Sequence, residues 1–392
     1  MIGDYRTPTL PPAVLQTSSV DKESLGITMN RIVEVFNEFG IGIKDVKTTF
    51  GPVVDFWEII PTVDVRMKEI QKMSYDIELE LGSLGIVNVI CPIPQRRSLG
   101  IEIVKDKTLV IPVASLLNNK KYKESDMELP CVLGQKIGYE LFMFDLIKMP
   151  HVLIASASGQ GKTTVIHTLI ASLLCKKNPK DLQLVLIDPK KCEFDCYESL
   201  ATSFLFSKSV LTETDDIIDT LGSLNRLMDE RYDLLKIAGV HNIQEYNELI
   251  EKGVLDTGVH EHMPYIVVVI DEFGDLIITA GKEAEYSIVR IAELARAVGI
   301  HMIIATQRPT TNIITGSIKA NFPCRIALRV ATKIDSRTIL DMCGANNLVG
   351  HGDMLFLSGL YPIRIKGALT ETKDIDEICK QICQQYDNYN CP

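Results

Sequence analysis

The sequence predicts an α/β fold in which a small α/β domain precedes a larger domain with a parallel-sheet core. Three observations support this prediction. The chain has 392 residues, enough for two or three domains that each bury an ordinary core. Its hydrophobic fraction of 46% and charged fraction of 23% are those of folded proteins. Beyond residue 150, short apolar runs alternate with amphipathic stretches, as in sheets that helices cover on both faces.

Composition argues against several classes of protein. No apolar run reaches the roughly 18–20 residues that span a bilayer. The start of the chain, MIGDYRTPTLPP, lacks the layout of a signal peptide. We therefore expect a cytoplasmic protein without a membrane segment. The ten cysteines are scattered through a chain without an export signal, which favours free thiols over disulfides.

The distribution of charge favours one local binding surface. The formal net charge is −10, which argues against a surface that binds nucleic acid indiscriminately. Between Arg290 and Arg337, however, the sequence contains eight basic residues and two acidic ones. An acidic protein with one basic stretch is typical of a binding surface confined to one region.

Changes in composition divide the chain into five segments. Residues 1–20, rich in Pro, Thr and Ser, are predicted to be a flexible leader. Residues 21–115 form the small α/β domain, and the charged, Asn- and Lys-rich residues 116–130 form a linker. Residues 131–370 form the larger domain, and residues 371–392 form a C-terminal helical tail.

Apolar spacing predicts the main elements of both domains. In the small domain it predicts helices within residues 27–36 and 65–81, and strands at residues 53–60 and 86–94. In the larger domain, near-continuous apolar runs predict strands that are buried on both faces. These strands are expected at residues 151–155, 182–188, 265–271, 301–306, 325–330 and 354–357.

A phosphate-binding loop follows strand 151–155. A glycine-containing segment and a helical run, VIHTLIASLL, come directly after this strand, which is the order found in P-loop nucleotidases. Small residues let successive backbone N–H groups face phosphate oxygens, and the helix dipole adds to the attraction. The predicted nucleotide-binding residues are Ser156, Ala157, Ser158, Gly159, Gln160, Gly161, Lys162, Thr163 and Thr164.

Two residues of this loop have predicted chemical roles. Lys162 would contact the β- and γ-phosphates of ATP, and the Thr163 hydroxyl would ligate Mg²⁺. Ser156 stands where the pattern GxxxxGK[ST] has its first glycine. The alternative interpretation is a chance turn before a core helix, so a partner motif is needed to decide.

The partner motif is YIVVVIDEF at residues 265–273. Its two carboxylates follow a buried strand, at the sheet edge where α/β proteins bind ligands. Asp271 would hold Mg²⁺ through its water shell, and Glu272 would accept a proton from the water that attacks the γ-phosphate. Taken alone, this motif could also be a strand that ends in two acidic residues exposed to solvent. Together with the phosphate loop, it predicts ATP hydrolysis.

Polar residues also end the next predicted strand, in HMIIATQRP at residues 301–309. Thr306, Gln307 and Arg308 follow a buried run beside the strand that carries the two carboxylates. Side chains at such a position can sense the γ-phosphate and report its loss. A hydrogen-bonded strand end without this role is the alternative.

Several long motifs make the chain resemble the motor region of the FtsK/SpoIIIE DNA translocases. The resemblance covers roughly residues 20–370, and its main departure is Ser156. The motifs, in the order of that family, are GPVVDFWEI, RSLGIEI, MPHVLIASASGQGKT, LVLIDPKK, VVVIDEFGDL, ELARAVGIHMIIATQRP, IITGSIKANFPCRIALRV, KIDSRTILD and GHGDMLF.

The resemblance implies a RecA-like P-loop ATPase domain preceded by an FtsK alpha-type domain. It also implies a homo-oligomer, six subunits in a ring around double-stranded DNA, with each ATP between neighbours. Arg296 matches the arginine finger that such a subunit supplies to its neighbour's ATP, and the resemblance places Lys333 near the same junction as an assisting residue. Arg308, Lys319, Lys333 and Arg337 match the DNA-binding pore loops, where basic residues can follow a phosphate backbone without reading bases.

The resemblance also sets expectations about partners. The family's cell-division members carry membrane helices and a winged-helix module, and the 22 residues after Thr370 are too few for that module. We therefore expect a phage or mobile-element motor, or a motor recruited by an unidentified loading partner. Two alternatives stay open. One is an ATP-driven motor for conjugation or protein secretion, and the other is a DNA partition factor that uses the nucleotide as a switch.

Overall fold

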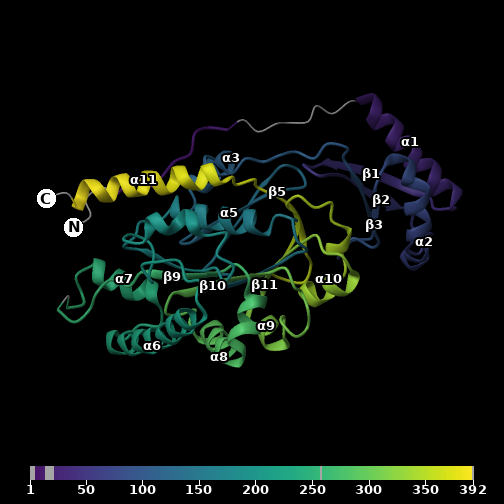
Figure 1. Ribbon diagram of the computed structural model, residues 1–392. Helices are drawn as coiled ribbons and strands as arrows, with labels where there is room; N and C mark the ends of the chain where they lie inside the picture. The colour runs from purple at the N-terminus through teal and green to yellow at the C-terminus, as the bar shows by residue number, and fades with distance from the viewer. Residues whose placement is uncertain (1–4, 14–21, 257, 391–392) are drawn as a thin grey trace.

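Two β-sheets organise the chain, and each forms the centre of one domain (Figure 1). The computed structural model describes residues 5–13, 22–256 and 258–390. The small domain contains a four-stranded sheet, and the large domain contains a nine-stranded sheet. Within the described ranges, no helix has the length and apolar character that crossing a bilayer requires.

The small domain pairs an antiparallel sheet with two helices. Its strands lie in the order β1-β2-β4-β3. Apolar side chains such as Ile32, Trp57 and Ile70 are buried together between the helices and the sheet. The sequence analysis did not predict β1 or β4. The elements are α1 (Lys22–Glu38), β1 (Ile43–Phe50), β2 (Val54–Pro61), α2 (Met67–Glu80), β3 (Val87–Ile90) and β4 (Leu99–Val104).

The large sheet has the predicted parallel core, and antiparallel strands extend it on one side, so the sheet as a whole is mixed. Five strands, from β11 to β8, are parallel, and these hold the predicted strands that begin near residues 151, 182, 265, 301 and 325. The predicted strand 354–357 is β12, which pairs antiparallel with β11. In spatial order the strands are β6 (Leu141–Asp145), β5 (Pro130–Lys136), β13 (Ile363–Gly367), β12 (Asp353–Leu357), β11 (Cys324–Leu328), β7 (His151–Ala155), β10 (Ile300–Thr306), β9 (Tyr265–Ile270) and β8 (Leu182–Ile187).

Helices cover both faces of the large sheet, which explains why its central strands are apolar throughout. Helices α5 and α11 lie on one face, and α6, α8 and α9 lie on the other (Figure 1). Helix α11 occupies most of the predicted helical tail, of which residues 391–392 lie outside the described residues. The helices of this domain are α3 (Val113–Leu117), α4 (Lys120–Lys123), α5 (Lys162–Leu174), α6 (Thr214–Ala238), α7 (Ile243–Glu251), α8 (Phe273–Leu294), α9 (Gly316–Asn321), α10 (Lys333–Leu340) and α11 (Thr372–Asn390).

The boundary between the domains lies before the predicted linker, which corrects the segment 116–130. Helices α3 and α4 fall in or next to this segment, and Leu116, Tyr122 and Leu129 are buried in the core of the large domain. The Asn- and Lys-rich composition misled the prediction because the charged side chains of α4 face solvent while Tyr122 packs inward. Residues 105–112 connect β4 of the small domain to α3, the first helix of the large domain.

Part of the predicted leader packs against α11. Gln385 exchanges two hydrogen bonds with the backbone of Arg6, at 2.7 and 2.8 Å, and Gln381 does the same with Thr9, at 2.9 Å each. The two glutamines are four residues apart, so they share one face of the helix. Leu10 is buried in the large domain, which anchors the segment further. The leader's remaining residues, 1–4 and 14–20, lie outside the described residues.

Two histidines are buried where the central strands begin. His151 opens β7, His301 lies in β10, and both are at most 1% exposed. Burial is the main cause that lowers the pKa of each to about 3. His301 stacks on Tyr265, with ring centroids 6.1 Å apart. Both histidines are therefore neutral in the folded protein at ordinary pH.

These histidines should make the free energy of unfolding depend on pH. In the unfolded chain these histidines take up protons as the pH falls below about 6.5, whereas in the folded chain they do so only near pH 3. The stability that is present above pH 6.5 is therefore lost as the pH falls toward 3. In His301→Phe, the slope of unfolding free energy against pH should decrease by about 1.4 kcal/mol per pH unit between about pH 4 and 6. Denaturant titrations across this range measure the slope. An unchanged slope would show that His301 does not titrate as described.

Candidate nucleotide site

The predicted phosphate loop connects the end of β7 to the start of α5. Gly159 and Gly161 have φ values of +73° and +101°, which side chains rarely tolerate. A Cβ atom on Gly161 would also lie 3.3 Å from the backbone nitrogen of Gly352, which is a tight contact. Because the loop leads into α5, its backbone N–H groups are in the position that binds phosphate in P-loop proteins.

Ser156 fits its position in the loop without strain. It is fully buried, and it is not among the residues with positive φ, so its backbone does not require the usual glycine. Its N–H donates to the Thr306 carbonyl oxygen at 3.2 Å, and the Ala157 N–H donates to the Arg329 carbonyl oxygen at 2.9 Å. Two neighbouring strand ends therefore hold the start of the loop. Among the described residues, the Ser156 hydroxyl has no hydrogen-bond partner.

Lys162 lies next to the two predicted catalytic carboxylates. Its Nζ atom is 3.0 Å from Asp271 Oδ1 and 3.5 Å from Glu272 Oε2. All three side chains are at most 3% exposed. Burial raises the pKa of Asp271, and the Lys162 charge opposes this shift. Lys162 and both carboxylates thus share one buried site.

Glu272 accepts hydrogen bonds at both of its oxygens. The Thr306 hydroxyl donates to Oε1 at 2.6 Å, and the Gln307 N–H lies 3.1 and 3.2 Å from Oε1 and Oε2. Lys190 Nζ is 3.4 Å from Oε2. The predicted general base is therefore surrounded by donors from β10, from the loop after β8 and from α5. Any proton transfer to it would compete with these contacts.

Gln307 joins the two halves of the site. Its side-chain oxygen accepts a hydrogen bond of 2.6 Å from the Ser158 hydroxyl in the phosphate loop. Its backbone N–H contacts Glu272, as described above. A residue that touches both the loop and the base is well placed to respond when a phosphate leaves, which is the role predicted from its position after β10.

Oxygen donors gather where a metal ion bound to the nucleotide would lie. Thr163 follows Lys162 at the start of α5, and Asp271 lies beside Lys162. Glu193 lies near both residues. Its pKa is raised, mainly by burial and also by the Asp271 charge, while a hydrogen bond with Thr163 opposes the shift. Within the described ranges, no group of three or more His, Cys, Asp or Glu could hold a metal alone. Hydroxyl and carboxylate oxygens suit Mg²⁺, which usually shares its ligands with phosphates and water.

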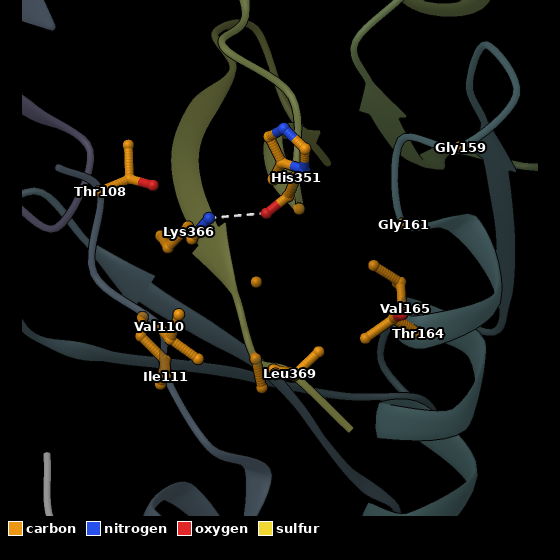
Figure 2. Close-up of a pocket in the computed structure, with 13 residues that line it drawn as sticks. Thr108, Val110, Ile111, Gly159, Gly161, Thr164, Val165, His351, Lys366 and Leu369 are labelled. Atoms are coloured by element: carbon orange, nitrogen blue, oxygen red, sulfur yellow. Dashed lines mark hydrogen bonds between the residues drawn. The ribbon is translucent and has the colours of Figure 1, made fainter. Parts of the chain in front are cut away.

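A cavity of about 450 Å³ opens beside the phosphate loop (Figure 2). Gly159, Gly161 and Thr164 form one wall. The opposite wall comes from β13 and from the segment that joins the two domains, with Val110, Ile111 and Leu369 as apolar contacts. Figure 2 shows His351 and Lys366 between these walls, where Lys366 Nζ donates to the His351 carbonyl oxygen at 2.6 Å. The cavity fits the base and ribose of a nucleotide whose phosphates lie on the loop.

Arg296 lies far from this site. It lies in the turn after α8, just before β10. It is exposed, and its charge contributes to the lowered pKa of His151 at the start of β7. The seven residues of β10 separate this edge of the sheet from Thr306 by about 20 Å. Arg296 therefore cannot contact a nucleotide bound on its own phosphate loop.

The four residues predicted to bind DNA are at or near the surface, but they belong to separate local contacts. Arg308 follows β10 and is 3.6 Å from Asp275. Lys319 in α9 pairs with Asp341 at 2.7 Å, which partly neutralises it. Lys333 and Arg337 are exposed and share α10, four residues apart.

Sequence reasoning missed several residues that line or support the site. Lys190 and Glu193 follow β8, whose carboxyl end lies beside that of β9, so the position of that strand end could have drawn attention to them. Asp275 lies in the first turn of α8, just after the predicted carboxylates. His351 lies in the motif GHGDMLF, but no pattern in the sequence placed it or Lys366 at the site, because both reach the cavity only through the folding of β12 and β13.

Comparisons with known sequences agree with this geometry. The profile of the FtsK/SpoIIIE family matches residues 112–311, and that of the FtsK alpha domain matches residues 8–104. The chain is 41% identical over 379 residues to the DNA translocase FtsK of Chlorobaculum tepidum, covering 94% of the chain and 46% of the relative. It is 35% identical over 368 residues to the DNA translocase SpoIIIE of Bacillus subtilis, covering 93% of the chain and 46% of the relative. The chain thus spans about half the length of these relatives.

Solved structures confirm the P-loop ATPase fold. The pCW3 conjugation coupling protein TcpA, in its monomer form with ATPgS, matches with a TM-score of 0.62 and 24% identity, over 90% of this chain and 99% of that one. The cytoplasmic domain of the Thermomonospora curvata Type VII secretion ATPase EccC matches with a TM-score of 0.59 and 23% identity, over 70% of this chain and 34% of that one. At these identities the likeness concerns the fold alone.

The unpartnered Ser156 hydroxyl leads to a prediction about stability. Ser156→Ala removes a buried polar atom without a hydrogen bond, so it should leave the free energy of unfolding unchanged or raise it by about 1 kcal/mol. Nucleotide affinity should stay within about twofold, because the loop binds phosphate through its backbone and Lys162. Chemical denaturation and nucleotide titration measure the two quantities. A tenfold loss of affinity would instead show that the hydroxyl contacts the nucleotide.

Proposed function

Because the chain belongs to the FtsK/SpoIIIE family, we propose that it is an ATP-driven translocase that moves along double-stranded DNA. The family assignment confirms the resemblance identified in the sequence. The activity of the whole protein is our proposal, because the chain spans only about half of its relatives. The observation that carries the proposal is the buried contact of Lys162 with Asp271 and Glu272 next to the phosphate loop.

The proposed hydrolysis assigns a role to each of these groups. The phosphates of ATP lie on the loop of residues 156–164, and Lys162 neutralises charge on the β- and γ-phosphates. Thr163 and Asp271 would hold Mg²⁺, which would neutralise charge on the phosphates. Glu272 accepts the proton of the attacking water. Gln307 links Glu272 to Ser158, so it can report the loss of the γ-phosphate.

We further propose that six subunits form a ring around the DNA. The position of Arg296 supports this, because a residue about 20 Å from its own phosphate loop can act only on another subunit's nucleotide. We propose that Lys333 assists at the same junction. Arg308, Lys319, Lys333 and Arg337 would follow the phosphate backbone without reading bases, which suits a motor that must release each contact.

The cellular setting is part of the same proposal. We place the protein in the cytoplasm, where an unidentified partner would load it onto DNA. A pure nucleotide switch is disfavoured, because it would not need the intact base at Glu272. A motor for protein or conjugative transfer would share the fold, so the response to duplex DNA is the property that discriminates between the two.

ATP hydrolysis should rise strongly when long linear duplex DNA is added. Glu272→Gln should keep nucleotide affinity within about threefold but lower kcat at least about 100-fold, because an amide cannot take the proton. Lys162→Ala should lose hydrolysis altogether, because it removes the phosphate-bound cation. Steady-state phosphate release with and without DNA measures these effects. Glu283→Gln, an exposed change on α8, serves as the matched control and should behave like wild type.

Two outcomes would contradict this assignment. Wild-type turnover in Glu272→Gln would remove Glu272 from the role of base. Hydrolysis that ignores duplex DNA would favour a motor that moves another polymer.

Arg296 should act on the nucleotide of a neighbouring subunit. Arg296→Ala should leave nucleotide affinity nearly intact and slow hydrolysis by about 10³-fold or more, since the charge is needed in the transition state. In mixed rings, an Arg296→Ala subunit keeps its own Glu272 and can receive Arg296 from a Glu272→Gln neighbour. Hydrolysis should therefore reappear above that of either variant alone.

The control for this experiment replaces the Arg296→Ala partner with the double variant Arg296→Ala, Glu272→Gln. No subunit then carries Glu272, so no activity should return. If mixed rings form with the single variants and activity stays absent at all ratios, Arg296 does not act between subunits.

A further inference from the structure

Asp275 lies between two cations at the carboxyl edge of the large sheet. Its Oδ1 atom is 3.6 Å from Arg308 Nη2, and its Oδ2 atom is 3.3 Å from Lys190 Nζ. Lys190 Nζ is in turn 3.4 Å from Glu272 Oε2. Four side chains of alternating charge thus form a continuous row from Arg308 to the predicted general base.

The two ends of the row differ most in exposure. Arg308 is 57% exposed and Glu272 is 1% exposed, while Asp275 and Lys190 between them are 23% and 38% exposed. DNA could therefore reach Arg308, whereas Glu272 is beyond the reach of any macromolecule. A signal from DNA to the base must pass through intermediate groups, and Asp275 and Lys190 are the charged groups that connect the two ends.

Lys190 is held by both carboxylates at once. Burial alone would lower its pKa, but the Glu272 and Asp275 charges outweigh burial and raise it, so the ammonium stays charged. Its distances to the two carboxylates differ by only 0.1 Å, as 3.4 and 3.3 Å. A change in the charge near either carboxylate would therefore shift the preference of Lys190 between them.

The contact with Lys190 opposes the proposed role of Glu272. Oε1 accepts from Thr306, and the Gln307 N–H lies 3.1 and 3.2 Å from Oε1 and Oε2. Oε2 also lies near the cations Lys162 and Lys190. Lys162 would turn to phosphate when ATP binds, which leaves Lys190 as the cation that still competes for Oε2. A water molecule can give its proton to Oε2 only where a lone pair is available.

We propose that Lys190 and Asp275 are positioning residues that couple DNA contact at Arg308 to the availability of Glu272. This inference rests on the proposed function, in which Arg308 binds DNA and Glu272 acts as the base. Without DNA, Arg308 neutralises part of the Asp275 charge, and Lys190 stays shared with Glu272. When a DNA phosphate takes Arg308, the uncompensated Asp275 draws Lys190 toward itself and frees Oε2 for the attacking water.

A static ion network would respond differently to mutation. If the contacts only stabilised the fold, removing Lys190 or Asp275 would weaken the protein in the same direction. The proposed coupling through Asp275 and Lys190, which we call the relay, instead predicts that the two changes have opposite effects on hydrolysis without DNA. Losing Lys190 frees Glu272, whereas losing the Asp275 charge leaves Lys190 with Glu272 as its only carboxylate partner in the row.

The test measures kcat and KM for ATP with and without long duplex DNA. Lys190→Gln should raise the DNA-free kcat about threefold to tenfold, the effect of losing one partly buried ionic contact. Asp275→Asn should leave the DNA-free kcat at or below the wild-type value. In both variants the stimulation by DNA should fall to about twofold or less. KM for ATP should stay within about twofold, because the phosphate loop and Lys162 are unchanged.

Two further variants make the test sharper. Lys190→Arg keeps the charge and should restore both the low basal rate and the stimulation by DNA. Arg308→Gln should raise the DNA-free rate as Lys190→Gln does, an effect that loss of DNA binding alone would not cause. Thermal unfolding should show that all four variants fold.

Each outcome bears on either the relay or the proposed function. If wild-type hydrolysis does not respond to DNA, the proposed function fails, and the relay fails with it. If wild type responds and Lys190→Gln or Asp275→Asn keeps the full response, the relay alone is wrong. A loss of kcat in both variants without DNA would also overturn it, because that pattern belongs to residues that hydrolysis requires directly.

Discussion

The buried contact of Lys162 with Asp271 and Glu272 is the constraint on which the rest of the structure depends. A lysine that is 3% exposed is costly unless opposite charges lie beside it, and both carboxylates are as deeply buried. The sheet order places β7, β10 and β9 side by side, which brings the phosphate loop, Thr306 and the carboxylates to one edge.

A second cluster of buried charged side chains connects the small domain to the loop that contacts the nucleotide site. Arg364 in β13 donates to Asp353 at 2.7 and 3.1 Å and also contacts Glu102 of the small domain. Asp353 ends the loop 349–353, in which the Gly352 N–H donates to the Gln160 carbonyl oxygen at 3.1 Å. The phosphate loop is thus linked to the small domain by a short series of contacts. The cavity beside the phosphate loop is shaped by the same segments.

Much of the site could be predicted from sequence because its parts are contiguous. A buried strand, small residues and Lys162-Thr163 form one short motif, and Asp271-Glu272 directly follow another strand. The antiparallel half of the sheet was harder to predict, because polar residues interrupt the apolar pattern of its strands. Gln135 is buried in β5, and Arg364 in β13 pairs with Asp353 of the next strand. His351 and Lys366 meet Val110 only after β13 pairs between β5 and β12. The ion pairs of Lys190 depend on side-chain positions that no spacing encodes.

Movement along DNA, driven by hydrolysis at this site, is the central claim. It is tested most directly by displacement of a triplex-forming oligonucleotide from a long linear duplex. With ATP and Mg²⁺, the wild-type chain should release the oligonucleotide, at a time that increases with the distance from the free DNA end. Glu272→Gln should bind the same duplex and release nothing. If the wild type hydrolyses ATP in response to DNA but leaves the triplex intact, the chain is a DNA-dependent ATPase and not a translocase.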